Sequence, residues 1–250
     1  MIETYYLGMY WGPRQESAEV CAQRTAHMVR LLEPLDPLFA RWFKCVRSLK
    51  ESLKRPLDVE LGALGQYIQS RVMRDSARRP MADLGFSVHL WNGESGGDDV
   101  WLDVCCGGYF EQVPNSCVLR TPYKGPVGER VLTTAFQKQV LRAIATAWDP
   151  DWGVAMSHAH RDLLKDTDSK VPAGWVTYLS HRRGRVPPLP APVRIEPVGE
   201  LGSLVILTPE RFTASNPEHL ELASRVRERL DQAGLLQRPN AGGAAPTADG

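Results

Sequence analysis

Residues 86–106 read FSVHLWNGESGGDDVWLDVCC, and this stretch decides the fold class. Apolar residues such as Val88 and Leu90 alternate with more polar neighbours, and a second alternating run follows over 100–105. The connection at 92–99 is rich in Gly, Asn and Asp, which is typical of a turn. Two alternating runs joined in this way predict an antiparallel β-hairpin with one face toward the core.

Helical patterns flank this hairpin. Ser17 is a predicted N-cap, and an apolar stripe at helical spacing follows it. Residues 130–147 form the longest amphipathic run. The last helix is the best specified: Asn216 precedes a proline at the first helical position, and Gly234 stands where a C′ glycine belongs. Shorter helices are predicted to start at Ser48 and over 58–73, and further strands at 2–11, 116–121, 153–157, 174–180, 193–197 and 203–208.

Helices and strands interleave here without a regular βαβ rhythm. The sequence therefore predicts an α+β fold: a single domain over residues 1–238 with a mainly antiparallel sheet packed by helices. Residues 239–250, PNAGGAAPTADG, have nothing apolar to bury and are predicted to be a disordered tail. A division into two subdomains near residue 125 stays open, because a Gly- and Pro-containing segment there would serve as a linker.

Composition narrows the class of protein. The formal net charge is +1, from 30 basic and 29 acidic residues, whereas a nucleic-acid-binding protein usually has a clear basic excess. The five cysteines form no CxxC pair, which favours free thiols in a reducing compartment. The first residues lack the pattern of a secretory signal, and no stretch has the ~20 apolar residues of a membrane helix. We therefore expect a cytoplasmic protein that binds neither nucleic acid nor membrane.

Specific catalytic motifs are missing from the sequence: there is no GxSxG, GxxxxGK[ST], GxGxxG or HExxH. The best metal candidate is the set His158, His160 and Asp162, whose histidines would share one face of an extended segment. A metal-dependent hydrolase using these residues is one alternative function. His89 is a candidate general base beside Asp103 on the partner strand, but the sequence offers no nucleophile for it.

The stretch 41–55 is strongly basic and contains Trp42 and Phe43. Aromatic side chains among lysines and arginines suit single-stranded nucleic acid, which makes a nucleic-acid-binding accessory protein the second alternative. The simpler interpretation is a solvated helix that Trp42 and Phe43 anchor to the core. The near-neutral total charge favours this simpler interpretation.

Several stretches together resemble the immunity protein 52 family of bacterial polymorphic toxin systems, over residues 5 to about 236. They are YYLGMYWGPRQES (5–17), ADLGFSVHLWNG (82–93), DPDWGVAMSH (149–158), GWVTYLS (174–180) and TPERFTASNPEHLELA (208–223). The resemblance implies an α+β domain that binds a cognate protein toxin and blocks it inside the producing cell. It implies that the toxin carries a restriction-endonuclease-like nuclease domain. It supplies no catalytic residues, so we expect no enzyme, no cofactor and no metal site.

Two acidic segments, residues 94–103 and 149–168, are the predicted contacts with such a toxin. A nuclease presents a basic cleft, and complementary charge speeds association. The alternative is that these acids only keep the surface soluble. Aromatic side chains are the second kind of predicted contact, since they are common interface anchors. The predicted partner-binding residues are Glu94, Asp98, Asp99, Asp149, Asp151, Trp91 and Trp152.

Overall fold

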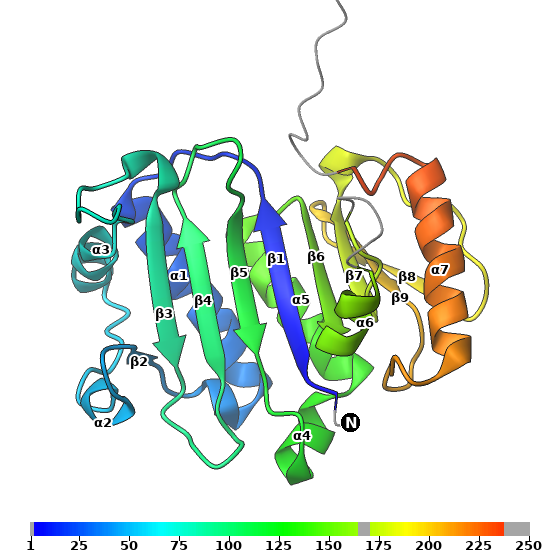
Figure 1. Ribbon diagram of the computed structural model, residues 1–250, viewed down its shortest axis with the longest axis horizontal. Coiled ribbons are helices and arrows are strands. Elements are labelled where there is room, and N and C mark those ends of the chain that lie inside the picture. The colour runs from blue at the N-terminus through cyan, green and yellow to red at the C-terminus, as the bar shows by residue number, and fades with distance from the viewer. Residues whose placement is uncertain (1–2, 165–170, 238–250) are drawn as a thin grey trace, which may run out of the picture.

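A computed structural model describes residues 3–164 and 171–237 of the chain. Its centre is one nine-stranded sheet in the order β2-β3-β4-β5-β1-β6-β7-β9-β8, and every neighbouring pair is antiparallel (Figure 1). The strands are β1 (Tyr5–Trp11), β2 (Phe43–Lys44), β3 (Phe86–Trp91), β4 (Trp101–Cys106), β5 (Asn115–Arg120), β6 (Trp152–Ser157), β7 (Val176–Ser180), β8 (Arg194–Val198) and β9 (Gly202–Ile206). The predicted α+β class with an antiparallel sheet is confirmed.

The helices within the described residues are α1 (Ala18–Leu32), α2 (Leu49–Ser52), α3 (Leu61–Ser70), α4 (Gly125–Val131), α5 (Thr134–Trp148), α6 (His158–Leu163) and α7 (Pro217–Gln232). Four short 3₁₀ turns lie at 33–35, 37–39, 82–84 and 181–183. Strands from both sides of residue 125 belong to the same sheet, since β1 pairs with both β5 and β6. The predicted tail, 239–250, lies outside the described residues.

Local sequence signals set the helix ends as predicted. Ser17 accepts a hydrogen bond from the Val20 N–H at the start of α1. At the end of α7, Gly234 has a φ of 73°, which favours glycine because it has no Cβ. The Leu235 N–H then donates to the Leu230 carbonyl at 3.0 Å, and both leucine side chains are buried. This is the Schellman closure that the sequence predicts.

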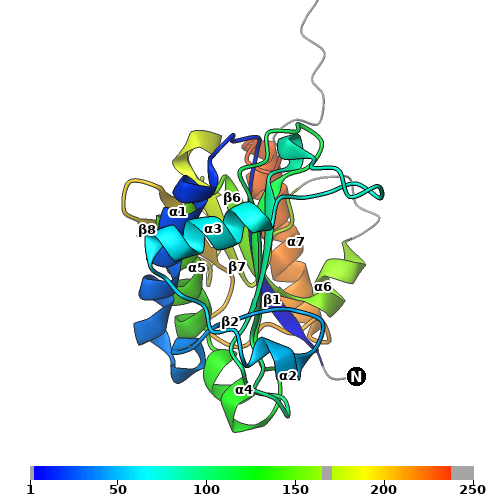
Figure 2. The same cartoon turned by 90° about the vertical axis from the view of Figure 1, so that its left-hand side faces the viewer.

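Helices cover the two faces of the sheet unequally. The helices α1 and α5 pack across one face, and α6 and α7 lie on the other face only over the β6–β9 half (Figures 1 and 2). The burial of β3, β4 and β5 therefore alternates. Side chains toward α1 and α5, such as Val88, Leu102 and Leu119, are fully buried, whereas their neighbours on the strand are partly exposed. The result is a sheet with one half of one face uncovered.

Candidate functional site

The uncovered part of the sheet, called the open face below, has no helix over it among residues 3–164 and 171–237 (Figure 1). Its side chains come from four adjacent strands and mix polar with apolar groups. They are Tyr10, Ser87, His89, Trp101, Asp103, Cys105, Ser116, Val118 and Arg120, all partly or well exposed. An uncovered sheet face of this mixed composition is suited to contact another protein.

A chain of polar side chains crosses the open face. Ser87 Oγ lies 3.0 Å from His89 Nε2, and His89 Nδ1 lies 2.6 Å from Asp103 Oδ1. On the next strand, Arg120 Nη2 donates to Asp103 Oδ2 at 2.7 Å. Burial alone would raise the pKa of Asp103, but the hydrogen bond from His89 and the charge of Arg120 outweigh it and lower the pKa below its usual value.

This connectivity is that of a serine–histidine–carboxylate relay, in which histidine accepts the serine proton. The sequence placed His89 beside Asp103 but offered no nucleophile; the structure places Ser87 there. Its signal in the sequence is the two-residue spacing to His89 on one strand face. A hydrolytic site also needs donors for an oxyanion. Backbone N–H groups beside Ser87 on this edge are already used, because Ser87 donates to the Arg71 carbonyl and Met73 donates to the Gly85 carbonyl.

The two tryptophans among the predicted partner-binding residues are both buried, so neither is an exposed aromatic anchor in this structure. Trp91 is only 2% exposed, because its ring lies against the rings of Phe43 and Trp101. Trp152 is 9% exposed, because Tyr10 stacks on it with ring centroids 4.3 Å apart. The aromatic rings that the open face presents are therefore the covering ones, Trp101 and Tyr10, and not those beneath them.

The structure does not bring the two acidic segments together. The 92–100 loop follows Trp91 at one end of the sheet. From strand to strand at this end, Trp91 pairs with Trp101, Trp101 with Arg120, and Arg120 with Tyr6 near the start of β1. The 149–151 loop lies at the other end of the sheet, where Tyr10 pairs with Trp152. Within the first loop, Glu94 pairs with Arg41 at 3.2 Å, while Asp99 accepts the indole N–H of Trp101 at 2.7 Å. Asp98 is the acid of this loop with an exposed side chain and no ion pair within 3–164 and 171–237.

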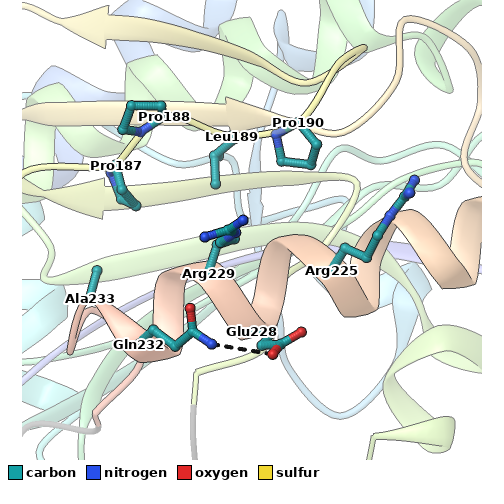
Figure 3. A pocket seen from close by; sticks show the side chains of 9 residues that line it. All are labelled: Pro187, Pro188, Leu189, Pro190, Arg225, Glu228, Arg229, Gln232 and Ala233. Carbon is teal, nitrogen blue, oxygen red and sulfur yellow. Dashed lines mark hydrogen bonds between the residues drawn. The ribbon is translucent and has the colours of Figure 1, made fainter.

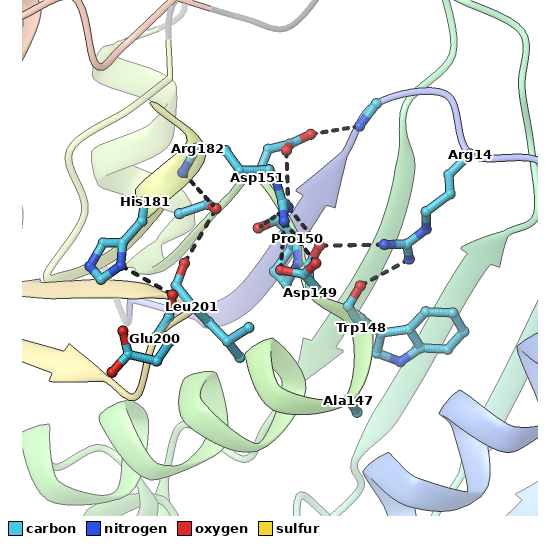
Figure 4. A network of polar contacts seen from close by, with 12 residues as sticks. Arg14, Ala147, Trp148, Asp149, Pro150, Asp151, His181, Arg182, Glu200 and Leu201 are labelled. Atoms are coloured by element: carbon cyan, nitrogen blue, oxygen red, sulfur yellow. Dashed lines mark hydrogen bonds and ion pairs between the residues drawn. The ribbon is translucent and has the colours of Figure 1, made fainter. Parts of the chain in front are cut away.

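Asp149 and Asp151 are engaged within the fold (Figure 4). Arg182 donates to both carboxylate oxygens of Asp149, at 2.8 and 2.7 Å, and to Asp151 at 3.3 Å. Asp151 also accepts the backbone N–H of Gly12 at 2.8 Å, and Arg14 donates to the carbonyl of Trp148 at 2.9 Å. These two acids join the end of α5 to β6 and β1, so much of their charge is already compensated.

The set His158, His160 and Asp162 is not extended, contrary to the geometry predicted for a metal site. These residues lie in α6, which Ser157 caps, and residues two apart on a helix do not face each other. His158 contacts Thr4 at 3.0 Å, and Asp162 pairs with Arg161. His160 stacks on Phe212 with ring centroids 4.7 Å apart, and burial lowers its pKa to about 4. Within the described residues, no three His, Cys, Asp or Glu side chains are grouped to hold a metal ion.

The basic stretch 41–55 forms the edge strand β2 and the one-turn helix α2. Trp42 is 4% exposed and stacks on Phe39, with ring centroids 6.0 Å apart. Phe43 lies against Trp91, 6.4 Å away. Both rings are therefore committed to the core or to the sheet edge, as in the simpler interpretation of the sequence, and neither is presented for stacking on a base.

A hollow of about 790 Å³ lies at the opposite end of the molecule, between α7 and the proline-rich segment 187–190 (Figure 3). Pro187, Leu189 and Pro190 form one side, and Arg225 and Arg229 project from α7 on the other. Glu228 in its wall accepts a hydrogen bond from Gln232 at 3.2 Å. The hollow is far from the open face and does not contribute to it.

The structure itself defines the class first: an α+β domain built on an antiparallel sheet. The fold resembles that of the Pseudomonas aeruginosa T6SS protein PA0821, with a TM-score of 0.54 over 98% of this chain and 77% of that chain. At 12% sequence identity, this likeness shows the fold alone. The family model for Immunity protein 52 matches residues 3–239, and the chain belongs to that family. No curated protein sequence matches the chain significantly.

No helix among residues 3–164 and 171–237 is long and apolar enough to cross a membrane.

Proposed function

We propose that this protein is an immunity protein that binds and neutralises a cognate toxin in the cytoplasm of the cell that produces both. One observation carries the proposal: the Immunity protein 52 family model covers residues 3–239, nearly the whole chain. The structural neighbour, which is named as a T6SS protein, is consistent with this proposal. The protein then works by stoichiometric binding, without catalysis, cofactor or metal.

For the toxin, a nuclease with a restriction-endonuclease-like domain is the finer proposal, and it rests on the family resemblance. For the contact surface, we propose the open face around Trp101 and Val118. These two side chains are partly exposed on a rigid sheet, and rigid surfaces lose little conformational entropy on binding. Of the acidic residues, Glu94 and Asp98 keep exposed side chains beside this face and remain candidate contacts.

The test is co-expression with the toxin that, by the family resemblance, is expected to be encoded in the neighbouring gene. Val118→Glu places a charge in the middle of the open face and should abolish rescue of growth and weaken binding at least tenfold. Ile195→Glu is the matched control, since Ile195 is a β-branched residue, 41% exposed, on the distant edge strand β8. Both variants must keep the melting temperature of the wild type. Equal rescue by both variants would reject the open face as the contact. Failure of the wild type to bind or rescue would reject the proposed function.

A second candidate function is ester hydrolysis, which the Ser87–His89–Asp103 relay favours. In such a reaction His89 takes the proton of Ser87 while Oγ attacks an ester carbonyl, and the proton passes to the leaving alcohol. A fluorophosphonate probe tests it directly, because it labels activated serines. Labelling that Ser87→Ala and His89→Ala abolish, and that Ser116→Ala on the same face retains, would support hydrolysis. Labelling no faster than that of the heat-denatured chain would reject it.

A further inference from the structure

Positive charge is concentrated on one edge of the sheet. Residues 41–55 and 71–80, called the basic edge below, contain ten basic and two acidic residues. The other residues of the chain contain 20 basic and 27 acidic ones, so the near-neutral total hides a strong asymmetry. Such a local field attracts partners of opposite charge even when the net charge of the protein is close to zero.

The fold brings these two segments, which residues 56–70 separate in the sequence, onto the same strand. β2 pairs with one end of β3, where Lys44 lies opposite Leu90. At the other end of β3, Val72 forms a bridge with Phe86, and the 71–81 segment folds back on itself. Both segments project on the side of the sheet that carries α6 and α7, as the edge-on view shows (Figure 2). The basic edge therefore borders the open face along the whole length of β3.

Most of these charges have no acidic partner within the described residues. Two ion pairs involve the basic edge there: Arg41 with Glu94, and Arg79 with Asp75. The remaining exposed bases are Arg47, Lys50, Lys54, Arg55, Arg74 and Arg78. The acidic loops differ in this respect, because Asp149 and Asp151 share Arg182 and Glu94 has Arg41. Among the acids of these loops Asp98 stays exposed and without an ion pair in the described residues, so the larger unpaired charge is that of the basic edge, the opposite of what the sequence predicts for the contact.

Apolar side chains lie among these bases. Val46, Leu49 and Leu53 are 38%, 48% and 48% exposed around α2. An apolar cluster ringed by lysine and arginine fits a protein surface, where it gains contact area, better than it fits phosphates. Single-stranded nucleic acid would need aromatic rings for stacking, whereas Trp42 is buried against Phe39 and the Phe43 ring lies against Trp91. The acidic surplus elsewhere on the chain also repels a polyanion.

We propose that the basic edge docks onto an acidic surface patch of the toxin, beside the open face, with Val46, Leu49 and Leu53 as the apolar part of this second contact. The inference rests on the proposed function and names the chemistry of the partner's surface. It has a consequence for a nuclease toxin: the contacted patch lies outside the basic cleft that holds DNA. Inhibition would then come from neighbouring parts of the open face or from a shift in the toxin, and not from acidic mimicry of DNA.

The experiment measures association of the chain with the immobilised toxin domain from the neighbouring gene, at about 20 mM and about 500 mM salt. Arg47→Glu with Lys54→Glu changes the α2 segment, and Arg74→Glu with Arg78→Glu changes the second segment. Arg225→Glu with Arg229→Glu on α7 is the control, since it alters the net charge equally at the far end of the molecule. Each edge variant should associate about tenfold or more slowly at low salt and much less so at high salt, whereas the control should change less than about twofold.

Each outcome has a distinct meaning. Equal slowing by the α7 control would show that only net charge matters and would overturn the inference, as would wild-type rates in both edge variants. Wild-type binding to a short DNA duplex at physiological salt, lost in the edge variants, would make the edge a nucleic-acid surface and also overturn it. Toxin binding by the wild type in the same assay keeps the proposed function even then. Absence of any wild-type binding would overturn both.

Discussion

Arg182 binds the carboxylate of Asp149 through a single nitrogen: Nη1 donates to both oxygens, at 2.8 and 2.7 Å. Asp149 is the C-cap of α5 and has a φ of 47°, so the chain turns sharply there before β6 begins. The Nη2 of Arg182 meanwhile donates to the carbonyls of Asp149 and Pro150. One arginine on the turn after β7 thus secures the turn between α5 and β6. The carboxylates of Asp149 and Asp151 therefore stabilise the fold at this turn, and their presence does not by itself indicate a binding surface.

Removing Arg182 should therefore lower stability and leave binding kinetics almost unchanged. In Arg182→Ala, two neighbouring carboxylates and two carbonyls lose their partner, and we expect a loss of about 1 kcal/mol, since these groups are partly solvated. Denaturant unfolding measures it. The control is Arg185→Ala, an exposed arginine without an ion pair among the described residues. Equal stability of the two variants would contradict the role of the Arg182 network.

Reversing the charge of the 92–100 loop should accelerate association with the toxin. Glu94→Lys with Asp98→Lys frees Arg41 and adds positive charge next to the basic edge, so attraction to an acidic patch should increase at low salt. Stopped-flow association at two salt concentrations measures the effect. Slower association in this variant would instead support the acidic contact that the sequence predicts. The sign of the change therefore decides between the two kinds of partner surface.

Stability should fall as pH drops through the range of His160. Burial lowers the pKa of His160 from 6.5 to about 4 in the folded protein. Below about pH 6.5 the unfolded state takes up a proton that the folded state refuses, so the free energy of unfolding decreases toward pH 4, by up to about 3 kcal/mol. His160→Phe keeps an aromatic ring against Phe212 and should flatten the profile between pH 7 and about pH 5. His27→Asn, which removes a histidine from an exposed position of α1, is the matched control.

Two glycine substitutions should change stability in opposite directions. A Cβ on Gly202 would lie 2.3 Å from the Leu179 carbonyl oxygen, a backbone atom that cannot move aside, so Gly202→Ala should cost about 3 kcal/mol. A Cβ on Gly65 would lie 3.9 Å from Glu19, an ordinary contact, within the helix α3. Gly65→Ala should therefore add about 0.5 to 1 kcal/mol through helix propensity. Thermal or chemical unfolding of both variants tests the packing at α3 and at β9, and a loss of stability in Gly65→Ala would contradict it.

The sequence determined the features that depend on near neighbours. Ser17 and Asn216 begin helices, and Gly234 ends one, because each satisfies or frees backbone groups within a few residues of itself. Alternation along 86–106 determined which side chains face the core, so that Cys105 is partly exposed and Cys106 is fully buried. The same alternation placed His89 beside Asp103, since a slip of one residue would turn the apolar side chains of β4 away from the core.

Only the tertiary structure decided which of these groups are available to a partner. Trp91 and Trp152 are buried because side chains from other strands lie over them, and Asp149 is compensated by an arginine 33 residues away. The open face exists because α6 and α7 pack over one half of the sheet and leave the other half uncovered. The exposure of a side chain and the compensation of its charge both depend on contacts with segments that are distant in the sequence. A local pattern in the sequence reports what a residue can do, whereas the packing of the whole chain determines whether solvent or a partner can reach it.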